Sequence, residues 1–281
     1  MSHEDDIQRF DQDHPWPHDD GVTSLFKFSS VNRDKLSRLE QLFCDGKLYH
    51  STPDQFNDPF ECKPHFNWPK DPKKVAEIRK HLTQILRRNG ISWKEAKRLV
   101  ANSMRRPGFI HESIYTSAEH SFNRARICSF TTSNKNLLFW AHYANSHKGF
   151  CVEYDAKILP ISYSFKVKYV DEYPEIEYPA PDDKRALSPA LMKSTAWSYE
   201  EEYRSIFIPG AERQAKHDGS SLILNGSEMK NIYFGAKMTD DDKALIEDLV
   251  SKGPFTAKLW ESNLSRTSFE IEFSPYKPGI S

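Results

Sequence analysis

One block of the chain, residues 71–124, has the pattern of helix throughout, and it limits the folds that the sequence can adopt. Apolar residues recur every three or four positions in PKKVAEIRKHLTQILRRNG and SWKEAKRLVANSMRR, and a further helical segment runs from about residue 110 to 124. The basic residues of this block fall on a solvated face. Successive helices with no strand between them do not fit a regular βαβ alternation, so the pattern predicts an α+β protein with a helical insertion.

The rest of the chain is rich in short segments with the alternation or the residue content of β-strands. Strands are predicted at 23–30, 47–51, 126–132, 150–155, 164–170, 199–208, 222–225, 230–234, 255–260 and 267–273. Helices are predicted at 33–44, 136–145, 189–197 and 239–252; Asn32 is expected to cap the first and Gly149 to stop the second. We therefore expect a mixed, mostly antiparallel sheet core.

The chain is long enough for one large domain. It has 281 residues, of which 38% are hydrophobic, and this suits a protein with a proper core. Residues 1–21 are acidic and rich in Pro and His, which predicts a disordered or extended arm. We expect residues 22–281 to form a single α+β domain, with the helical insertion at about 71–124 and a long surface loop at 173–189.

Charge and hydropathy exclude several classes of protein. The net charge is −1, so we expect no long-range attraction to nucleic acid, although a local basic patch stays open. The longest apolar run, LLFWA, is too short to span a membrane, and the N-terminal residues lack the apolar core of a signal peptide. The four cysteines are widely spaced, which favours reduced thiols. These features predict a cytoplasmic protein with no membrane partner, and they leave the oligomeric state open.

The stretch LLFWAHYANSHKGFCVEYD, residues 137–155, concentrates aromatic and histidine side chains. On a helix, Trp140, Tyr143 and His147 share a face, and His142 lies beside it. The two histidines are five positions apart and do not converge on a metal ion, so no metal site is predicted. The rings are either core residues or the wall of a cleft, with His142 as a polar group at its edge.

The segment FNDPFE, residues 56–61, is a second candidate. Asn57 and Asp58 precede a proline, and their side chains can bond to backbone amides in an Asx-type turn. This structural interpretation is the stronger one for Asp58. Asn57 could instead present its amide group to a ligand, because loops that follow strands often line pockets.

The third candidate is WSYEEEYRSIFI, residues 197–208. If it is a strand, Glu200, Glu202 and Arg204 share one face with two isoleucines. Buried carboxylates without partners are costly, so we expect this charged end at the rim of a cavity, with Arg204 pairing one glutamate. The alternative is an ion pair at the surface. The two glutamates are the leading candidates for catalytic or ligand-binding carboxylates.

Three segments together resemble a known family. FNDPFE, WAHYANSHKGFCVEYD and KSTAWSYEEEYR followed by IYFGAKM are similar to domain-of-unknown-function family 2971, which is mostly prokaryotic. The likeness runs from about Leu25 to Phe273. The family has no settled activity, so the resemblance implies relatives of the fold and no reaction.

A looser resemblance is to the ADP-ribosyltransferases. These enzymes have a polar residue on a first strand, a Ser-x-Ser/Thr on a following strand, and a Glu-x-Glu late in the chain. Lys27 or His50, the triplet Ser129–Thr131, and Glu200 with Glu202 could match these positions, although no arginine occupies the first strand. The resemblance implies NAD as substrate, with nicotinamide stacked on Tyr143 or Trp140 and a glutamate stabilising the oxocarbenium charge.

Three functions are therefore weighed. The first is an NAD-consuming transferase or glycohydrolase, for which a role as a toxin or a defence effector is considered. The second is a metal-dependent nuclease or phosphodiesterase that uses Asp58, His142 and Glu202. The third is a non-catalytic module whose polar residues, Arg204 among them, bind a ligand or a partner.

Overall fold

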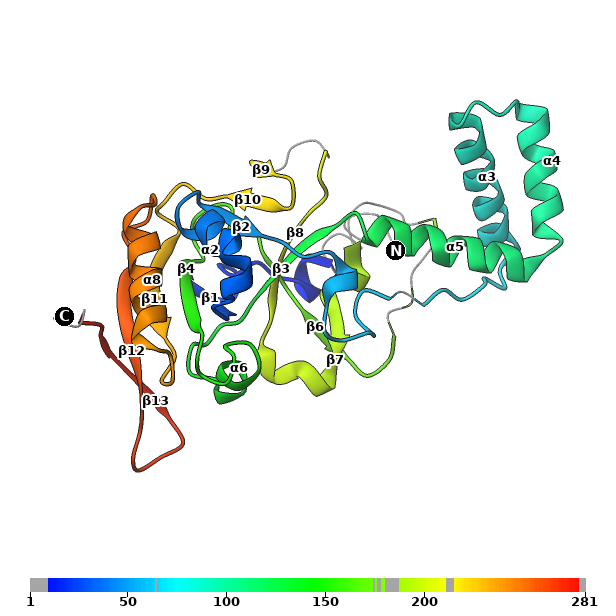
Figure 1. The fold of residues 1–281 in the computed structure, drawn as a ribbon. Helices are drawn as coiled ribbons and strands as arrows, with labels where there is room; N and C mark the ends of the chain where they lie inside the picture. The colour runs from blue at the N-terminus through cyan, green and yellow to red at the C-terminus, as the bar shows by residue number, and fades with distance from the viewer. Residues whose placement is uncertain are drawn as a thin grey trace. The chain divides into compact units, whose positions relative to one another are not determined.

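The chain divides into two compact units. The computed structural model describes residues 10–63, 65–173, 175, 178–179, 187–210 and 215–277. Unit 1 contains Met1–Thr52, Ala125–Lys168 and Ala196–Ser281, and unit 2 contains Pro53–Arg124 and Tyr169–Thr195 (Figure 1). The predicted α+β class is confirmed. The helical block is not an insertion limited to 71–124, however, because unit 2 also takes in the segments before it and at 169–195.

The main sheet of unit 1 has five strands in the order β1-β4-β11-β12-β13. Their bounds are β1 (Ser24–Ser29), β4 (Phe150–Asp155), β11 (Met229–Phe234), β12 (Lys258–Leu264) and β13 (Ile271–Pro275). All neighbours are antiparallel except β11 and β12, which are parallel. A parallel pair needs a crossover connection, and helix α8 (Asp240–Ser251) supplies it.

Two smaller sheets adjoin the main one in unit 1. One has β8 (Tyr203–Phe207) between β3 (Arg126–Phe130) and β5 (Phe165–Lys166); the other has β10 (Ser221–Ile223) between β2 (Lys47–Tyr49) and β9 (His217–Asp218). Single bridges join Phe26 to Thr131 and Ser51 to Ile127. These bridges place the end of β3 beside β1 and its start beside the chain that follows β2.

Different helices cover the two faces of the main sheet, and the side chains of each strand point to these faces in turn. Phe150 and Val152 belong to the core on the side of α2 (Leu36–Phe43) and α8, whereas Cys151 packs with Trp140 of α6 (Leu137–His142) on the other side. Asn32 caps the 3-10 turn η1 (Arg33–Lys35) that leads into α2, as predicted. Period-two alternation in β4 thus supplies both cores.

The N-terminal segment differs from its prediction. Residues 10–13 are helical, and Phe10 and His14 are buried, with the Phe10 ring 6.0 Å from that of Phe165. Asp20 accepts a hydrogen bond of 2.6 Å from the Tyr203 hydroxyl. From Phe10 onward, therefore, the segment is neither disordered nor extended, because its aromatic rings pack against later residues of unit 1.

Unit 2 is built on α3 (Pro72–Arg88), α4 (Trp93–Met104) and α5 (Pro107–Phe122). The Asp71 side chain caps α3 and the Ser92 side chain caps α4, which explains why these helices begin where they do. Ile78, Ile110 and Ile114 form the core of this unit, in a buried cluster with Phe66.

The second half of unit 2 contains η3 (Ser188–Leu191) and β7 (Met192–Ser194), which pairs with β6 (Lys168–Val170). A helix at 189–197 was predicted and is wrong, since a strand and the start of a further 3-10 turn replace it. Lys193 forms an ion pair of 3.0 Å with Glu61, near the 3-10 turn η2 (Pro53–Gln55). Much of the loop predicted at 173–189 lies outside the described residues.

Among the described residues, none of the helices combines the length and the apolar character that crossing a bilayer requires.

Candidate functional site

Helix α6 carries the aromatic residues that the sequence singled out. The Asn136 side chain caps it by accepting from the Leu138 amide at 3.0 Å, and the helix ends at His142, three residues before the predicted end at 145. It stops there because Asn145, Ser146 and His147 adopt left-handed backbone conformations. The chain then re-enters the sheet through Gly149, where a β-carbon would lie 2.1 Å from the carbonyl oxygen of Ser29.

Trp140 is a core residue. Its side chain is 0% exposed, its indole N–H donates to the Asn134 carbonyl at 2.7 Å, and its ring stacks on that of His147 at 6.0 Å. The proposed ligand-stacking role of Trp140 is therefore wrong, because both the ring and its polar atom are already in contact with the protein.

His142 is exposed at the end of α6. Within the described part of the chain, no hydrogen bond or ion pair joins its ring to Glu200 or Glu202. The geometry therefore gives His142 no partner for acid–base catalysis at these carboxylates.

The acidic segment is not the single strand that was predicted at 199–208. Thr195–Glu200 forms a 3-10 turn, η4, and Glu201 has a positive φ of 44°. Strand β8 begins only at Tyr203. Glu200 and Glu202 therefore do not share a strand face by alternation, since the left-handed Glu201 turns the chain between them.

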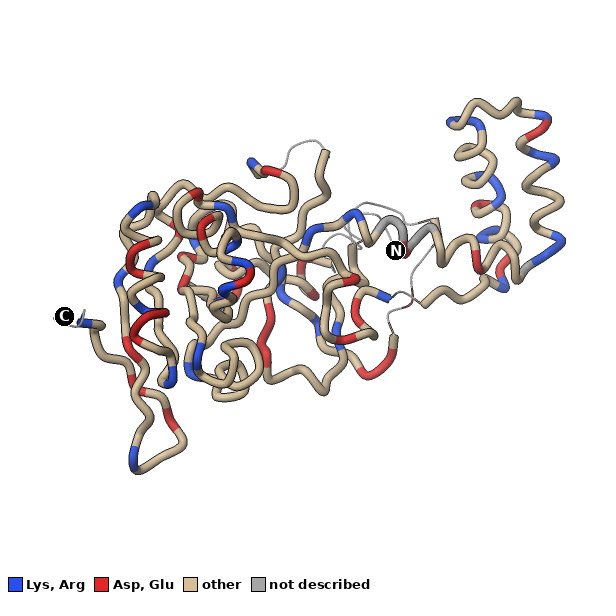
Figure 2. The backbone as a smooth tube through the Cα atoms, viewed as in Figure 1, with Lys and Arg blue, Asp and Glu red and all other residues tan. Residues whose placement is uncertain are grey.

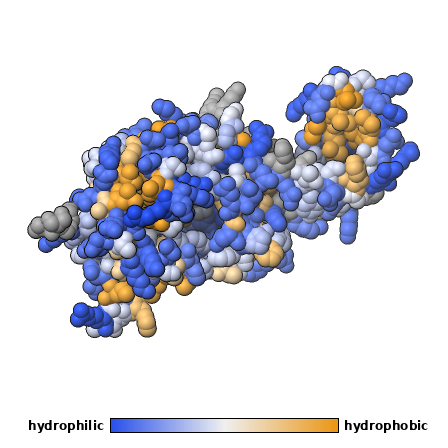
Figure 3. Space-filling model, viewed as in Figure 1, coloured by the Kyte–Doolittle hydropathy of each residue, from blue (hydrophilic) through white to orange (hydrophobic). Residues whose placement is uncertain are grey.

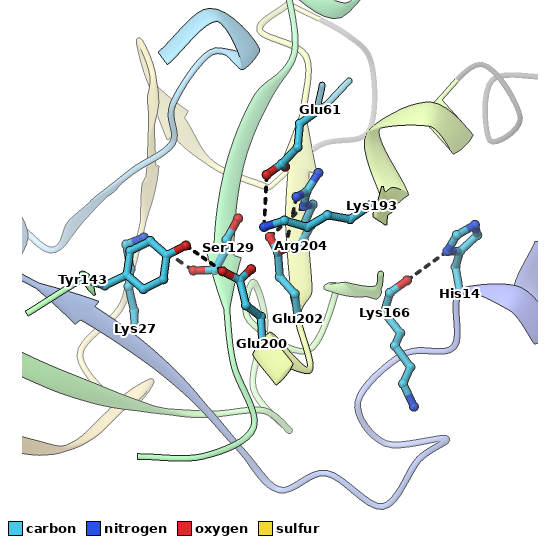
Figure 4. Close-up of polar contacts among 10 residues, drawn as sticks. All are labelled: His14, Lys27, Glu61, Ser129, Tyr143, Lys166, Lys193, Glu200, Glu202 and Arg204. Carbon is cyan, nitrogen blue, oxygen red and sulfur yellow. Dashed lines mark hydrogen bonds and ion pairs between the residues drawn. The ribbon is translucent and has the colours of Figure 1, made fainter. Parts of the chain in front are cut away.

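The helix and the acidic segment nevertheless meet. The Tyr143 hydroxyl donates to Glu200 Oε1 at 2.6 Å, and the Asn136 amide donates to the Tyr199 carbonyl at 2.9 Å (Figure 4). Glu200 is 3% exposed, whereas Tyr143 is half-buried. The two segments are therefore in direct contact, with a partly accessible ring bonded to a buried carboxylate.

Arg204 pairs with Glu202, as predicted. Arg204 Nε lies 2.7 Å from Glu202 Oε1, and Nη2 lies 3.1 Å from Oε2, so both carboxylate oxygens are bound (Figure 4). The pair is neither at a cavity rim nor at the surface, because Arg204 is 0% and Glu202 3% exposed. Strand β8 is the middle strand of its sheet, and a two-bond geometry offsets part of the cost of burying both charges.

The strands that carry Lys27 and Ser129 adjoin β8. Ser129 lies opposite Arg204 in the β3–β8 register, and Lys27 Nζ reaches the Ser129 carbonyl at 3.5 Å. The bridge between Phe26 and Thr131 joins β1 to β3 at the same place. The structure thus brings together Lys27, Ser129, Glu202 and Arg204 on three neighbouring segments.

Asn57 and Asp58 belong to unit 2, which is described by itself. Asp58 is buried, and its Oδ1 accepts from the Phe60 amide at 2.9 Å. The interpretation of Asp58 as a turn residue is therefore confirmed. Asn57 is exposed.

Two buried polar groups in unit 1 were not predicted as a site. His50, which the second resemblance offered only as a match for a strand position, donates from Nδ1 to the Leu48 carbonyl at 2.9 Å, and its Nε2 lies 3.2 Å from Ser205 Oγ. Burial lowers the pKa of His50 to about 3, so the ring is neutral and its Nε2 accepts a hydrogen bond from the Ser205 hydroxyl. Both residues are buried, which makes this pair a core contact.

Glu153 is the second such group. Burial alone would raise the pKa of its carboxyl, but hydrogen bonds from Ser24, Tyr233 and Asn231 hold it below its ordinary value. Its sequence signal is a charged residue in the middle of the apolar strand FCVEYD. The carboxylate is held by these three neighbours and by an ion pair with Lys230 at 3.4 Å, and it links β4 to β1 and β11.

Over the residues that the structure describes, no group of three or more His, Cys, Asp or Glu side chains could hold a metal ion. Comparisons of this chain with protein-family models, with curated proteins and with solved structures found no match. The two family resemblances therefore stay predictions, and the geometry of unit 1 is what a functional proposal can use.

Proposed function

We propose that the protein consumes NAD as an ADP-ribosyltransferase or NAD glycohydrolase. The observation that carries the proposal is the 2.6 Å hydrogen bond between Tyr143 and Glu200. It joins a half-buried aromatic ring, suited to stack on nicotinamide, to a carboxylate suited to stabilise positive charge on the adjoining ribose.

The reaction breaks the bond between the nicotinamide nitrogen and the ribose C1′ carbon. The bonding electrons leave with nicotinamide, which becomes neutral, and the ribose takes on oxocarbenium character. Water or an acceptor side chain then forms the new bond at C1′ and loses a proton. A carboxylate placed at the ribose lowers the energy of this step because opposite charge develops there.

The residues of unit 1 divide these tasks. Glu200 is the carboxylate of the proposal, and Tyr143 provides the ring. Glu202 is a positioning residue, because both of its oxygens are bound by Arg204 and its carboxylate orients the start of β8. Lys27, beside Ser129, provides a cation for the pyrophosphate of NAD.

Access to Glu200 sets a condition on the mechanism. The side chain is 3% exposed, and the Tyr143 hydroxyl bonds to it. The ribose therefore reaches the carboxylate when the hydroxyl moves aside. On this basis, Tyr143→Phe should keep activity because the stacking ring stays, whereas Tyr143→Ala should raise KM.

The test is release of nicotinamide from NAD by the purified protein, followed by chromatography. Glu200→Gln keeps the shape of the side chain and removes its charge, and we expect it to lower turnover by roughly 10²- to 10³-fold. Glu201→Gln is the matched control. Glu201 is the next residue after Glu200, and its carboxylate is exposed and contacts Thr132. Turnover should stay within about threefold of wild type in this control.

Two outcomes would contradict the proposal. One is a wild-type protein that releases no nicotinamide at any NAD concentration tested. The other is a folded Glu200→Gln variant with unchanged turnover, which would assign any NAD cleavage to different residues. Circular dichroism of each variant establishes that the fold is intact.

A further inference from the structure

The hairpin formed by α3 and α4 of unit 2 carries a large positive charge, although the net charge of the whole chain is close to zero. Residues 70–106 include twelve Lys and Arg residues and three Asp and Glu residues, a net charge of +9, whereas the chain as a whole carries −1. All twelve basic side chains are exposed. Figure 2 shows the basic residues distributed along α3, α4 and their ends. So strong a local excess gives an attraction to polyanions that the overall charge does not suggest.

The cations of α3 form a row. Lys73, Lys80 and Arg87 follow one another at intervals of seven residues, or about two turns, so they line one side of the helix over about 21 Å. The opposite side carries Ile78, which is completely buried, and Leu82, which packs against the same core. The row therefore faces away from the core of the unit.

This row has few partners within the described part of the protein. No ion pair is found there at Lys73, Lys80 or Arg87, and the contact seen for the Arg87 guanidinium is a 3.3 Å hydrogen bond to the Ile91 carbonyl. On α4, by contrast, Glu95 binds Arg98 through two hydrogen bonds. The α3 row is thus the less neutralised of the two edges of the hairpin.

We propose that the α3 row is a docking surface for the phosphate backbone of a nucleic-acid duplex. A duplex carries about one negative charge per 1.7 Å of its axis, so 21 Å of duplex holds roughly a dozen phosphates, and the row faces those on its own side. Lysine and arginine side chains bind phosphate oxygens without reading the base sequence. The α3 row is therefore suited to contact the backbone of a duplex of any sequence.

The arrangement of apolar residues favours a duplex over a lipid surface. Between Lys73 and Arg87, the exposed residues on the same side of α3 are Ala76, Glu77 and Gln84, with no large apolar side chain to enter a bilayer. Figure 3 shows apolar residues on the hairpin bordered by hydrophilic ones. To act as a membrane anchor, the α3 row itself would need large apolar side chains beside its basic ones.

The test measures binding of the full-length protein to labelled RNA and DNA duplexes of the same sequence, by fluorescence anisotropy. Each duplex has about 20 base pairs, longer than the α3 row, and salt is varied from about 50 to 200 mM. The variant Lys73→Gln/Lys80→Gln/Arg87→Gln should weaken binding by roughly tenfold or more. It should also reduce the slope of log affinity against log salt by about 2 to 3, since each lost phosphate contact contributes about 0.9.

Three matched variants sharpen the result. Lys35→Gln/Lys157→Gln/Lys258→Gln removes three exposed charges from unit 1 and should change affinity by less than about twofold. Lys94→Gln/Arg98→Gln/Arg105→Gln removes three from the α4 edge and should weaken binding less than the α3 variant does. Glu77→Gln removes the one carboxylate within the α3 row and should tighten binding, which a purely structural role would not explain.

Glutamine preserves helix propensity, so circular dichroism should show unchanged helix content in every variant. Binding to either duplex with these rankings supports the proposal, and a difference between RNA and DNA tells which duplex is preferred. The proposal is overturned if the wild type does not bind at about 50 mM salt. It is also overturned if the α3 variant binds like the unit 1 control, if the α4 variant loses as much as the α3 variant, or if the protein binds phosphatidylserine vesicles and no duplex.

Discussion

Arg204 is completely buried, and its guanidinium binds both oxygens of Glu202. Replacing it with methionine removes this counter-charge from a buried carboxylate. We expect Arg204→Met to lower the free energy of unfolding by about 3–5 kcal/mol, as measured by urea denaturation.

The double variant Glu202→Gln/Arg204→Met is the control for this prediction. It removes both charges, so its loss of stability should be clearly smaller than the sum of the two single variants. Additive losses would mean that the two side chains do not stabilise each other.

His50 gives the protein a pH dependence of stability. Its pKa is about 3 in the folded state, because of burial, and near 6.5 in the unfolded chain. Between these values the unfolded chain binds the extra proton, so this contribution is complete above about pH 6.5 and decreases as the pH falls towards 3. The slope approaches about 1.4 kcal/mol per pH unit.

The measurement compares the free energy of unfolding of wild type and His50→Gln from pH 7 to pH 5. The difference between the two proteins should shrink by roughly 2 kcal/mol, which subtracts the effect of the carboxylates common to both. His142→Gln, at an exposed ring, is the control for a histidine substitution outside the core. A pH-independent difference for His50→Gln would contradict the assignment.

At the scale of residues, the sequence predicted which side chains bond to each other better than it predicted how deeply they are buried. The spacing of Glu202 and Arg204 suggested an ion pair, and the capping residue Asn32 was identified correctly. The depth of Arg204 was not predictable, because it depends on β3 and β5, distant in sequence, closing on both sides of β8. The burial of Trp140 likewise depends on a ring contact with Phe28, which lies far away in the sequence.

Asn136 joins two elements with one side chain. Its oxygen caps α6 through the Leu138 amide, and its amide group donates to the Tyr199 carbonyl in η4. Asn136→Ala should therefore lower the free energy of unfolding by about 2 kcal/mol, the sum of a lost cap and a lost hydrogen bond.

Asn136→Asp separates these two effects. Aspartate keeps the capping oxygen but has no N–H to offer to Tyr199, so we expect about half of the loss seen with alanine. Equal losses for both variants in urea denaturation would show that the cap contributes nothing.

Element boundaries were the weakest part of the sequence analysis where the backbone leaves its ordinary regions. The strand predicted at 199–208 fails at Glu201, whose positive φ is unusual for glutamate and leaves no mark in the sequence. The helix predicted at 136–145 ends early for the same reason, at the left-handed residues Asn145 to His147. By contrast, the helices at 71–124 were predicted well, because long amphipathic periodicity is a strong local signal.

The four cysteines provide a test of the fold as a whole. Cys62, Cys128 and Cys151 are buried, whereas Cys44 is partly exposed. Burial raises the pKa of Cys128 and raises that of Cys151 well above its ordinary value. A thiol-specific reagent should therefore modify Cys44 alone in the native protein and all four thiols in denaturant.

The control is Cys44→Ser, which should reduce native labelling to near zero. Rapid native labelling of Cys128 or Cys151, identified by peptide mass spectrometry, would contradict the packing of β3 and β4. Because the reagent reports on two sheets and on unit 2 together, the result bears on the entire chain.

The division into two units could not be predicted from composition. Residues 169–195 join unit 2 because an isolated bridge pairs Glu175 with His65 and because Lys193 forms an ion pair with Glu61, which lies 132 positions earlier in the chain. Such long-range pairing has no local signature. The basic hairpin, in contrast, is visible in the sequence once charge is counted over residues 70–106 alone.

The order of strands in the main sheet has a consequence for synthesis on the ribosome. Strand β1 must wait for β4, whose residues are translated more than a hundred codons later, and the sheet is complete only when β13 emerges. The three helices of unit 2 are finished by residue 122, well before that. The three helices of unit 2 should therefore form first in the nascent chain. At that stage β1, which carries Lys27 of the proposed NAD site, has no neighbouring strand to pair with.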